Sequence, residues 1–236
     1  MISVVIPVYN EATCLAENVQ QFADLLSQIS KNDWEIILVN DGSTDSTESV
    51  IAKLAEDQHV HGIAHSENQG KGAAVRTGVL ATQGDLVLFC DADMSTAPEC
   101  LGLFLASLES GSDIAVGNRK SPDSVIEAWQ PPLRTWLGLR FTWLTNWCLG
   151  LSLSDYTCGF KLFRGPVARE LFELTESSAW AFDVEVLARA SRKNYRIAQI
   201  PVRWRHVADT RVKVIRDVIG SLIELISIRR RLGKKR

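Results

Sequence analysis

The sequence lacks several patterns that would place it in a familiar class of protein. It has no apolar stretch long enough to span a bilayer, and its first residues carry no basic segment of the kind that opens a signal peptide. Its five cysteines are scattered and form no C-x-x-C pair, which argues against a disulfide framework and a zinc site. These absences predict a protein of the reducing cytoplasm that can lie on a membrane but does not cross it.

Sequence signatures of three common enzyme classes are also missing. No G-x-G-x-x-G follows the first predicted strand, and neither G-x-S-x-G nor H-E-x-x-H occurs. A Rossmann oxidoreductase, an α/β hydrolase and an H-E-x-x-H zinc protease therefore lose support. The formal net charge is only -2, and the body of the chain has no basic stripe, so nucleic acid is not expected as a partner.

What the chain does contain is a regular alternation of strand-like and helix-like segments. Apolar residues recur at helical spacing between the strand-like runs, as at Leu15, Val19 and Phe22. This alternation predicts an α/β fold with a mainly parallel central sheet flanked by helices on both faces. The predicted strands cover residues 3–8, 34–40, 59–64, 86–90, 113–117, 158–163 and 196–200.

The fourth predicted strand stops abruptly at two carboxylates, Asp91 and Asp93. Open α/β sheets bind ligands at the carboxyl ends of their strands, and residues 94–98 favour a turn that would let both acids share one ion. Two hard oxygen ligands on a turn suit an octahedral cation such as Mg²⁺ or Mn²⁺, which keeps some waters and takes phosphate oxygens from its substrate. The alternative is a loop whose acids merely face water.

Two other loops carry candidate binding groups. Asp41 ends the second strand, where its carboxylate could bond a nucleobase or ribose hydroxyl, or could simply belong to a turn. The segment 68–72 resembles a phosphate-cradling loop at a helix start but lacks the Walker A spacing. Lys71 within it could meet a diphosphate, because a helix N-terminus and an ammonium attract the same anion. A solvated lysine is the other interpretation.

The second half of the chain contains two candidate membrane-binding segments. On a helix over residues 132–150, Trp136, Trp143 and Trp147 share one face, and Trp129 precedes it. Such a stripe can lie in the lipid headgroups or pack in a core. Residues 214–236 form a predicted amphipathic helix with a basic tail, which either attracts anionic lipid or is a frayed terminus.

Four motifs in the first half of the chain, over residues 5–11, 39–45, 68–72 and 91–93, carry a family resemblance. Their order and spacing resemble those of inverting family 2 glycosyltransferases of GT-A fold, and the likeness extends over nearly the whole chain. Three further motifs lie in the second half, over residues 155–163, 180–185 and 200–204. They resemble those of dolichyl-phosphate glucosyltransferases, with dolichyl-phosphate mannose synthases as the nearest relatives.

The resemblance implies roles for particular residues. It implies that Asp91 and Asp93 hold the metal and diphosphate, and that Arg119 faces the donor or acceptor phosphates. The residues that it places at the nucleoside are Pro7, Tyr9, Glu11 and Asp41.

One departure from the mannose-synthase pattern separates the two branches. Lys213 falls where those enzymes keep a phosphate-binding lysine, but Val207 stands where they have an arginine. This difference favours the glucosyl branch, and the charges that could replace the missing arginine are Arg134, Arg203 and Arg205.

The resulting prediction is a single catalytic domain over residues 1–213, followed by the amphipathic helix and tail. We expect it to move glucose from UDP-glucose to a polyprenyl phosphate on the cytoplasmic face of a membrane. The alternatives are GDP-mannose as the donor, or a hydroxyl acceptor. A phosphate acceptor is already anionic and requires no strong base, whereas a hydroxyl acceptor would need one, with Asp183 or Glu185 as the candidates.

Overall fold

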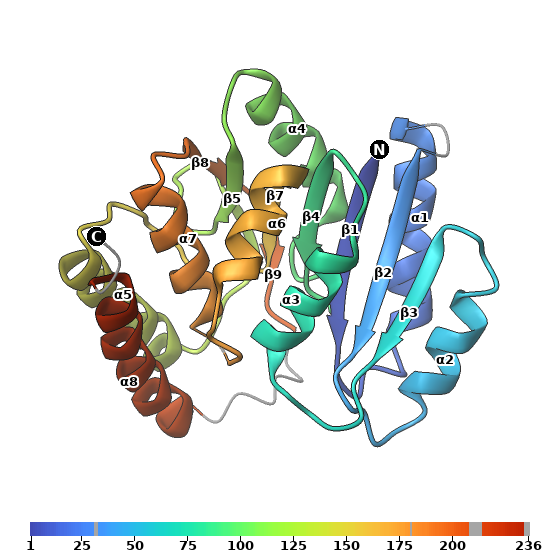
Figure 1. Ribbon diagram of the computed structural model, residues 1–236, viewed down its shortest axis with the longest axis horizontal. Coiled ribbons are helices and arrows are strands. Elements are labelled where there is room, and N and C mark those ends of the chain that lie inside the picture. The colour runs from blue at the N-terminus through green and yellow to red at the C-terminus, as the bar shows by residue number, and fades with distance from the viewer. Residues whose placement is uncertain (31–32, 180, 208–213, 234–236) are drawn as a thin grey trace.

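The central element of the protein is a seven-stranded mixed sheet (Figure 1). The computed structural model describes residues 1–30, 33–179, 181–207 and 214–233, and for residues 134, 214–219 and 221 it describes the backbone only. The sheet has the order β3-β2-β1-β4-β7-β5-β8. Its strands are β1 (Ile2–Val8), β2 (Trp34–Asn40), β3 (Val60–Ala64), β4 (Leu86–Cys90), β5 (Ile114–Asn118), β7 (Phe160–Arg164) and β8 (Ile197–Pro201).

Helices cover both faces of this sheet. One core cluster joins the sheet to α1, α2 and α4, and a second joins it to α3, α6 and α7. The bounds are α1 (Leu15–Ser30), α2 (Thr47–Leu54), α3 (Lys71–Ala81), a short 3₁₀ helix η1 (Pro98–Cys100), α4 (Leu101–Glu109), α6 (Gly165–Leu174) and α7 (Phe182–Arg192). The mainly parallel α/β sheet predicted from the alternating pattern is confirmed.

The antiparallel strand β7 is the feature that the alternating pattern does not reveal. It lies between β4 and β5, so that Lys161 is in register with Phe89 on one side and Val116 on the other. The residues that precede β7 therefore lie beside the carboxyl ends of both neighbours. This insertion brings the segment 155–159 to the edge where Asp91 and Asp93 stand.

Two long helices lie side by side beyond α7, at the left of Figure 1. They are α5 (Pro132–Leu149) and α8 (Val214–Gly233), and α8 buries Leu225, Ile228 and Leu232 in the second core cluster. A separate two-stranded parallel sheet pairs β6 (Val125–Ala128) with β9 (Arg203–Arg205). Among the residues described, no helix is both long enough and apolar enough to cross a bilayer.

Candidate active site

The two carboxylates predicted to hold a metal lie on a tight turn directly after β4. The chain turns at once, since the Met94 N–H donates to the Asp91 carbonyl at 3.2 Å and Met94 itself has a φ of 47°. Asp93 Oδ1 accepts from the Ser95 N–H at 2.9 Å. Burial and then repulsion from the charge of Asp91 raise the pKa of Asp93. The predicted turn after Asp91 is confirmed.

Gly159, just before β7, fixes the position of Asp91. Its carbonyl accepts the Asp91 N–H at 3.1 Å. A Cβ atom on Gly159 would lie 1.9 Å from Asp91 Oδ2, so only glycine leaves space for the carboxylate in this position. The close approach of the chain just before β7 thus fixes the position of the Asp91 carboxylate.

Lys71 stands at the first position of α3 and already contacts the acidic turn. Its Nζ lies 2.6 Å from Asp91 Oδ1 and 5.4 Å from the centre of the Phe89 ring. Burial alone would lower the pKa of Lys71, but Asp91, Asp183 and Asp93 together raise it above its usual value. The ammonium and the N-terminus of α3 therefore lie beside the acidic turn, and both attract an anion such as a diphosphate.

A second, fully buried ion pair lies next to the first. Lys161 Nζ is 2.7 Å from Asp183 Oδ1 and donates to the Cys158 carbonyl at 2.6 Å. Burial raises the pKa of Asp183, while Lys161 and then Lys71 pull it down. The predicted base candidate therefore has a committed cationic partner, which sequence reasoning missed because the two residues lie on different elements. Glu185 is likewise engaged, by Arg189 at 2.6 Å.

Hydrogen bonds fasten the loop after β1 to the loop after β2. Asn10 adopts a left-handed conformation with a φ of 54°, and its Oδ1 accepts from the Thr44 N–H at 2.6 Å. The Glu11 N–H donates to Thr47 Oγ1 at 2.9 Å. These bonds hold Tyr9 and Glu11 at the carboxyl edge of the sheet, beside the end of β2.

Asp41 organises the loop that leads into α3. Its carboxylate accepts from the N–H groups of Gln69 and Gly70, each at 2.9 Å, and lies 2.8 Å from His65 Nδ1. The side chain is buried, with 4% of its surface exposed. Asp41 therefore sets the position at which Lys71 begins its helix, a structural role beside its predicted contact with the nucleoside.

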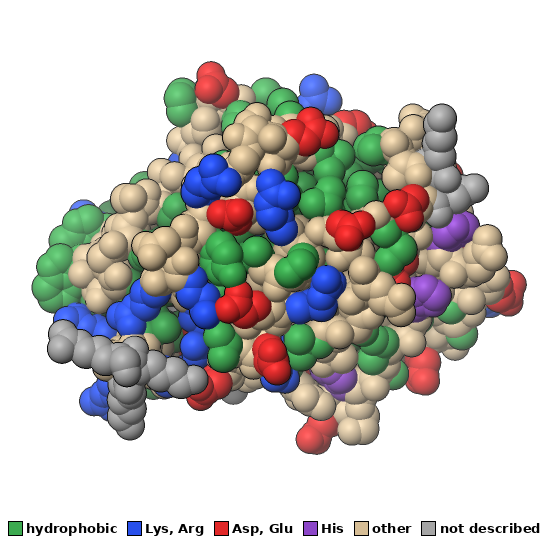
Figure 2. Space-filling view, turned by 45° about the horizontal axis from the view of Figure 1, so that its top comes forward, with side chains coloured by type: hydrophobic (Ala, Val, Ile, Leu, Met, Phe, Trp, Pro, Cys, Tyr) green, Lys and Arg blue, Asp and Glu red, His purple; other side chains and the backbone are tan. Residues whose placement is uncertain are grey.

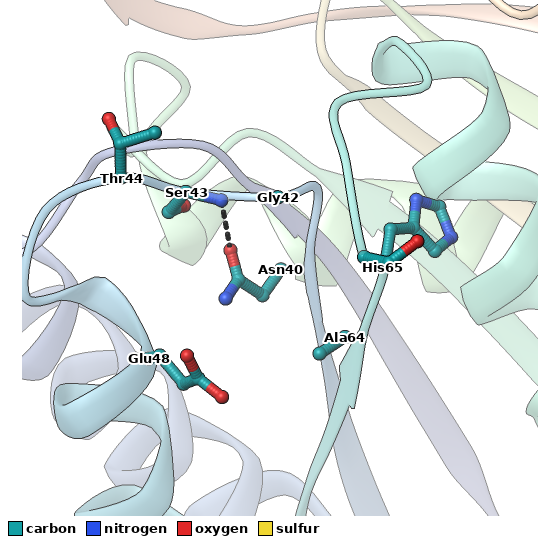
Figure 3. Close-up of a pocket in the computed structure, with 8 residues that line it drawn as sticks. Asn40, Gly42, Ser43, Thr44, Glu48, Ala64 and His65 are labelled. Atoms are coloured by element: carbon teal, nitrogen blue, oxygen red, sulfur yellow. Dashed lines mark hydrogen bonds between the residues drawn. The ribbon is translucent and has the colours of Figure 1, made fainter.

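A polar pocket of about 470 Å³ opens at the carboxyl ends of β2 and β3 (Figure 3). Asn40 lies within it and its Oδ1 accepts from the Ser43 N–H at 3.0 Å. The lining residues are Asn40, Gly42, Ser43, Thr44, Glu48, Ala64, His65 and Ser66. The pocket adjoins Asp41 and lies at the same sheet edge as the acidic turn.

Arg119, expected at a phosphate, is held by an acid that sequence reasoning did not single out. Its Nε and Nη2 donate to the two oxygens of Asp155, each at 2.7 Å, and Nη2 also donates to Thr157 Oγ1 at 2.9 Å. Burial alone would lower the pKa of Arg119, but the charge of Asp155 raises it above its usual value, and Asp91 adds to this increase. The guanidinium also stands 5.5 Å from the Trp204 ring. The motif that begins at Asp155 was the available signal.

The remaining predicted site residues are spread over several elements. Pro7 lies near the carboxyl end of β1. Arg203 and Arg205 are exposed on β9, and Arg203 forms an ion pair of 3.6 Å with an acid of β6. Arg134 belongs to the first turn of α5, although its side chain is not described, and Lys213 lies outside the described residues.

The acidic turn fits a divalent cation as part of a site rather than as a complete cage. Within the described ranges, no group of three or more His, Cys, Asp and Glu side chains could hold a metal ion. A cation would relieve the repulsion between Asp91 and Asp93, and hard carboxylate oxygens suit Mg²⁺ or Mn²⁺. The remaining ligands must then come from water and from a substrate.

The mixed sheet of this order, with an acidic turn after its central strand β4, is that of the GT-A fold. Residues 3–172 match the profile of "Glycosyl transferase family 2". The chain belongs to this family, as its motifs predicted.

Relatives and solved structures extend over most of the chain. Dolichyl-phosphate beta-glucosyltransferase ALG5C of Trichomonas vaginalis is 34% identical over 95% of this chain and 69% of its own length. The dolichyl-phosphate beta-glucosyltransferase of Saccharomyces cerevisiae is 32% identical over 97% of this chain and 74% of its own. Glucosyl-3-phosphoglycerate synthase from Mycobacterium tuberculosis, in complex with UDP, superimposes with a TM-score of 0.70 at 20% identity, covering 97% of this chain and 80% of that one.

Proposed function

We propose that this protein transfers glucose from UDP-glucose to a polyprenyl phosphate of the dolichyl type, with inversion, at the cytoplasmic face of a membrane. The observation that carries this proposal is the acidic turn of Asp91 and Asp93 with Lys71 beside it at the start of α3. Relatives named dolichyl-phosphate beta-glucosyltransferase, at 30 to 34% identity, support both the sugar and the acceptor.

The donor would lie across the carboxyl edge of the sheet. Asp91 and Asp93 would hold Mg²⁺ or Mn²⁺, which when bound neutralises charge on the diphosphate, and a solved neighbour contains Mn²⁺ with UDP. Lys71 stands at the N-terminus of α3, where the diphosphate would bind. Its ammonium can therefore turn from Asp91 to an oxygen of the diphosphate. The residues that border the nucleoside are Pro7, Tyr9, Glu11 and Asp41.

The acceptor phosphate needs no general base. Its second pKa is about 6, so an oxygen of the monoester is anionic at neutral pH. That oxygen forms the new bond to the anomeric carbon while the bond from this carbon to the diphosphate oxygen breaks, and UDP leaves with the electron pair. Asp183, engaged by Lys161, is then not required to take a proton.

Calorimetry with nucleotide sugars tests the donor assignment. We expect UDP-glucose to bind in the presence of Mg²⁺ or Mn²⁺ at least about tenfold more tightly than GDP-mannose, followed by transfer to a polyprenyl phosphate. The metal alone should give little heat, because two carboxylates, one of them paired with Lys71, are a weak site. Tighter binding of GDP-mannose would indicate a mannose synthase, and binding of neither would indicate a scaffold without activity.

The surface of α5 and α8 supports the membrane part of the proposal. Trp129, Trp136, Trp143 and Trp147 are between 53 and 74% exposed, so the core interpretation of these rings is wrong. Ile223 and Ile226 of α8 are also exposed. Figure 2 shows apolar side chains gathered at the end of the molecule where α5 lies, next to basic ones. We call the exposed apolar residues of these two helices the α5–α8 surface.

The basic residues near the end of α8 are divided between two roles. Arg229 and Arg230 are exposed and can face anionic lipid. Arg231 instead lies 3.2 Å from Glu185 and is partly buried, while residues 234–236 are outside the described part of the chain. Removing the chain end would therefore disturb packing as well as charge, which makes substitutions the cleaner test.

Vesicle co-sedimentation tests the α5–α8 surface. We expect the double substitution Trp143→Ser and Trp147→Ser to weaken binding to anionic vesicles by on the order of 10- to 100-fold, since it removes two large apolar groups. The control is Leu103→Ser, which changes an apolar residue of α4 that is 55% exposed and should leave binding normal. Undiminished binding of the tryptophan variant would contradict membrane contact through this surface.

A further inference from the structure

Lys120 lies just after Arg119 in the connection from β5 to β6, and two neutral acceptors hold its ammonium. Its Nζ donates to the Ser154 carbonyl at 2.6 Å and to Thr142 Oγ1 at 2.8 Å. The Thr142 hydroxyl donates its own hydrogen to the Gly138 carbonyl at 2.9 Å, so it accepts from Lys120. An ammonium has three N–H groups, and the third takes part in neither of these bonds.

In the part of the chain that the structure describes, the charge of Lys120 has no carboxylate partner of its own. Asp155, the acid that contributes to the pKa of Lys120, gives both oxygens to Arg119, and no carboxylate within the described ranges, Asp123 of the same connection included, lies within ion-pair distance of Lys120 Nζ. Burial lowers the pKa of Lys120, and Arg119 adds to this against the attraction of Asp155. An incoming anion would therefore be stabilised more by Lys120 than by a cation that already has a carboxylate partner, such as Arg119.

The strand register places Lys120 near the reacting centre. β4 and β5 are separated by the single strand β7, which pairs Lys161 with Phe89 and with Val116. Two strand spacings are about 10 Å, so the end of β5 lies roughly this far from the acidic turn. Asp91 adds to the raised pKa of Arg119, after the larger contribution of Asp155.

Lys120 also touches the helix that carries the exposed tryptophans. Its partner Thr142 precedes Trp143 on α5. A lipid whose chain lies in the bilayer presents its phosphate at the surface, and α5 connects that surface to the loop after β5. The ammonium thus stands between the α5–α8 surface and the carboxyl edge of the sheet.

We propose that Lys120 binds the phosphate of the polyprenyl phosphate acceptor through its third N–H. This inference rests on the proposed function and adds a residue to it. Arg119, already paired with Asp155, then serves to hold the loop on which Lys120 stands. Lys120 would recognise the phosphate monoester, so the binding of an isoprenoid alcohol without phosphate should not depend on Lys120.

Equilibrium binding of a short-chain polyprenyl phosphate to the UDP-bound protein tests the assignment. We expect Lys120→Met to weaken this binding by about 10- to 100-fold, as loss of a charge-assisted hydrogen bond does. Lys120→Arg should retain most of it, and the affinity for UDP-glucose should stay within about twofold in both variants. The corresponding polyprenol should bind wild type and Lys120→Met equally.

The matched control is Thr142→Val, which removes the contact of Lys120 with α5 but keeps the charge. If this variant loses acceptor affinity as strongly as Lys120→Met, the lysine only tethers α5 and the inference is overturned. Unchanged acceptor binding by Lys120→Met, or an equal loss of UDP-glucose affinity, would also overturn it. A wild-type protein that binds the polyprenyl phosphate but not UDP-glucose would contradict the proposed function instead, and leave the Lys120 comparison valid.

Discussion

Replacing Gly159 by alanine is expected to lower kcat/KM for glucose transfer by at least about 100-fold, since displacements of about 1 Å at a reacting centre have effects of this size. A Cβ atom at this position would lie 1.9 Å from Asp91 Oδ2, so the carboxylate must move away from the metal position. The backbone itself can accept alanine, because Gly159 does not have a positive φ. Steady-state kinetics with UDP-glucose, together with circular dichroism, would measure the effect.

The matched control for this substitution is Gly102→Ala. A Cβ atom at Gly102 would meet nothing within 4 Å, and alanine favours a helix such as α4. We expect this variant to keep full activity and equal or slightly higher stability. Activity of Gly159→Ala within about threefold of wild type would show that the position of Asp91 is not critical.

Replacing Asp183 by asparagine is expected to destabilise the fold by about 3–5 kcal/mol, because it leaves the Lys161 ammonium buried without a counter-charge. Lys161 and Asp183 side chains are only 2% and 4% exposed, so water cannot replace the lost partner. Chemical denaturation of the single variant would measure this loss. A change below about 1 kcal/mol would show that Lys161 finds another partner.

The double variant Lys161→Met and Asp183→Leu separates stability from chemistry. Replacing both members of a buried ion pair by apolar residues of similar volume is often nearly neutral, so we expect much of the lost stability to return. If the acceptor is a phosphate, turnover of the double variant should stay within about tenfold. A loss of roughly 100- to 10,000-fold in a stable double variant would indicate that Asp183 acts as a general base on a hydroxyl acceptor.

Local sequence patterns predicted the elements of this protein well. Apolar runs gave the strands, and the turn-forming residues after Asp91 correctly predicted that the chain would turn there. The strand β7 was also predicted, but its antiparallel place between β4 and β5 was not, because strand order depends on long-range pairing. The short pair β6 and β9 was missed, since its few residues alternate weakly.

Local sequence patterns could not predict which side chains pair with one another or which ones are exposed at the surface. Lys71 and Asp91, Arg119 and Asp155, and Lys161 and Asp183 each lie at least twenty residues apart along the chain. Likewise, a periodic stripe of tryptophans is compatible with burial or exposure, and only the packing of α5 against α8 left those rings at the surface.

The sequence by itself determined the α/β class, the acidic turn at the end of β4 and the family, because these depend on residue type, spacing and local turn preference. Only the tertiary structure decided that Gly159 fixes the position of Asp91, that Asp155 holds Arg119 and that Lys120 has no carboxylate of its own among the described residues. The physical reason is that these contacts arise where β7 enters the sheet and meets two strands distant in the chain.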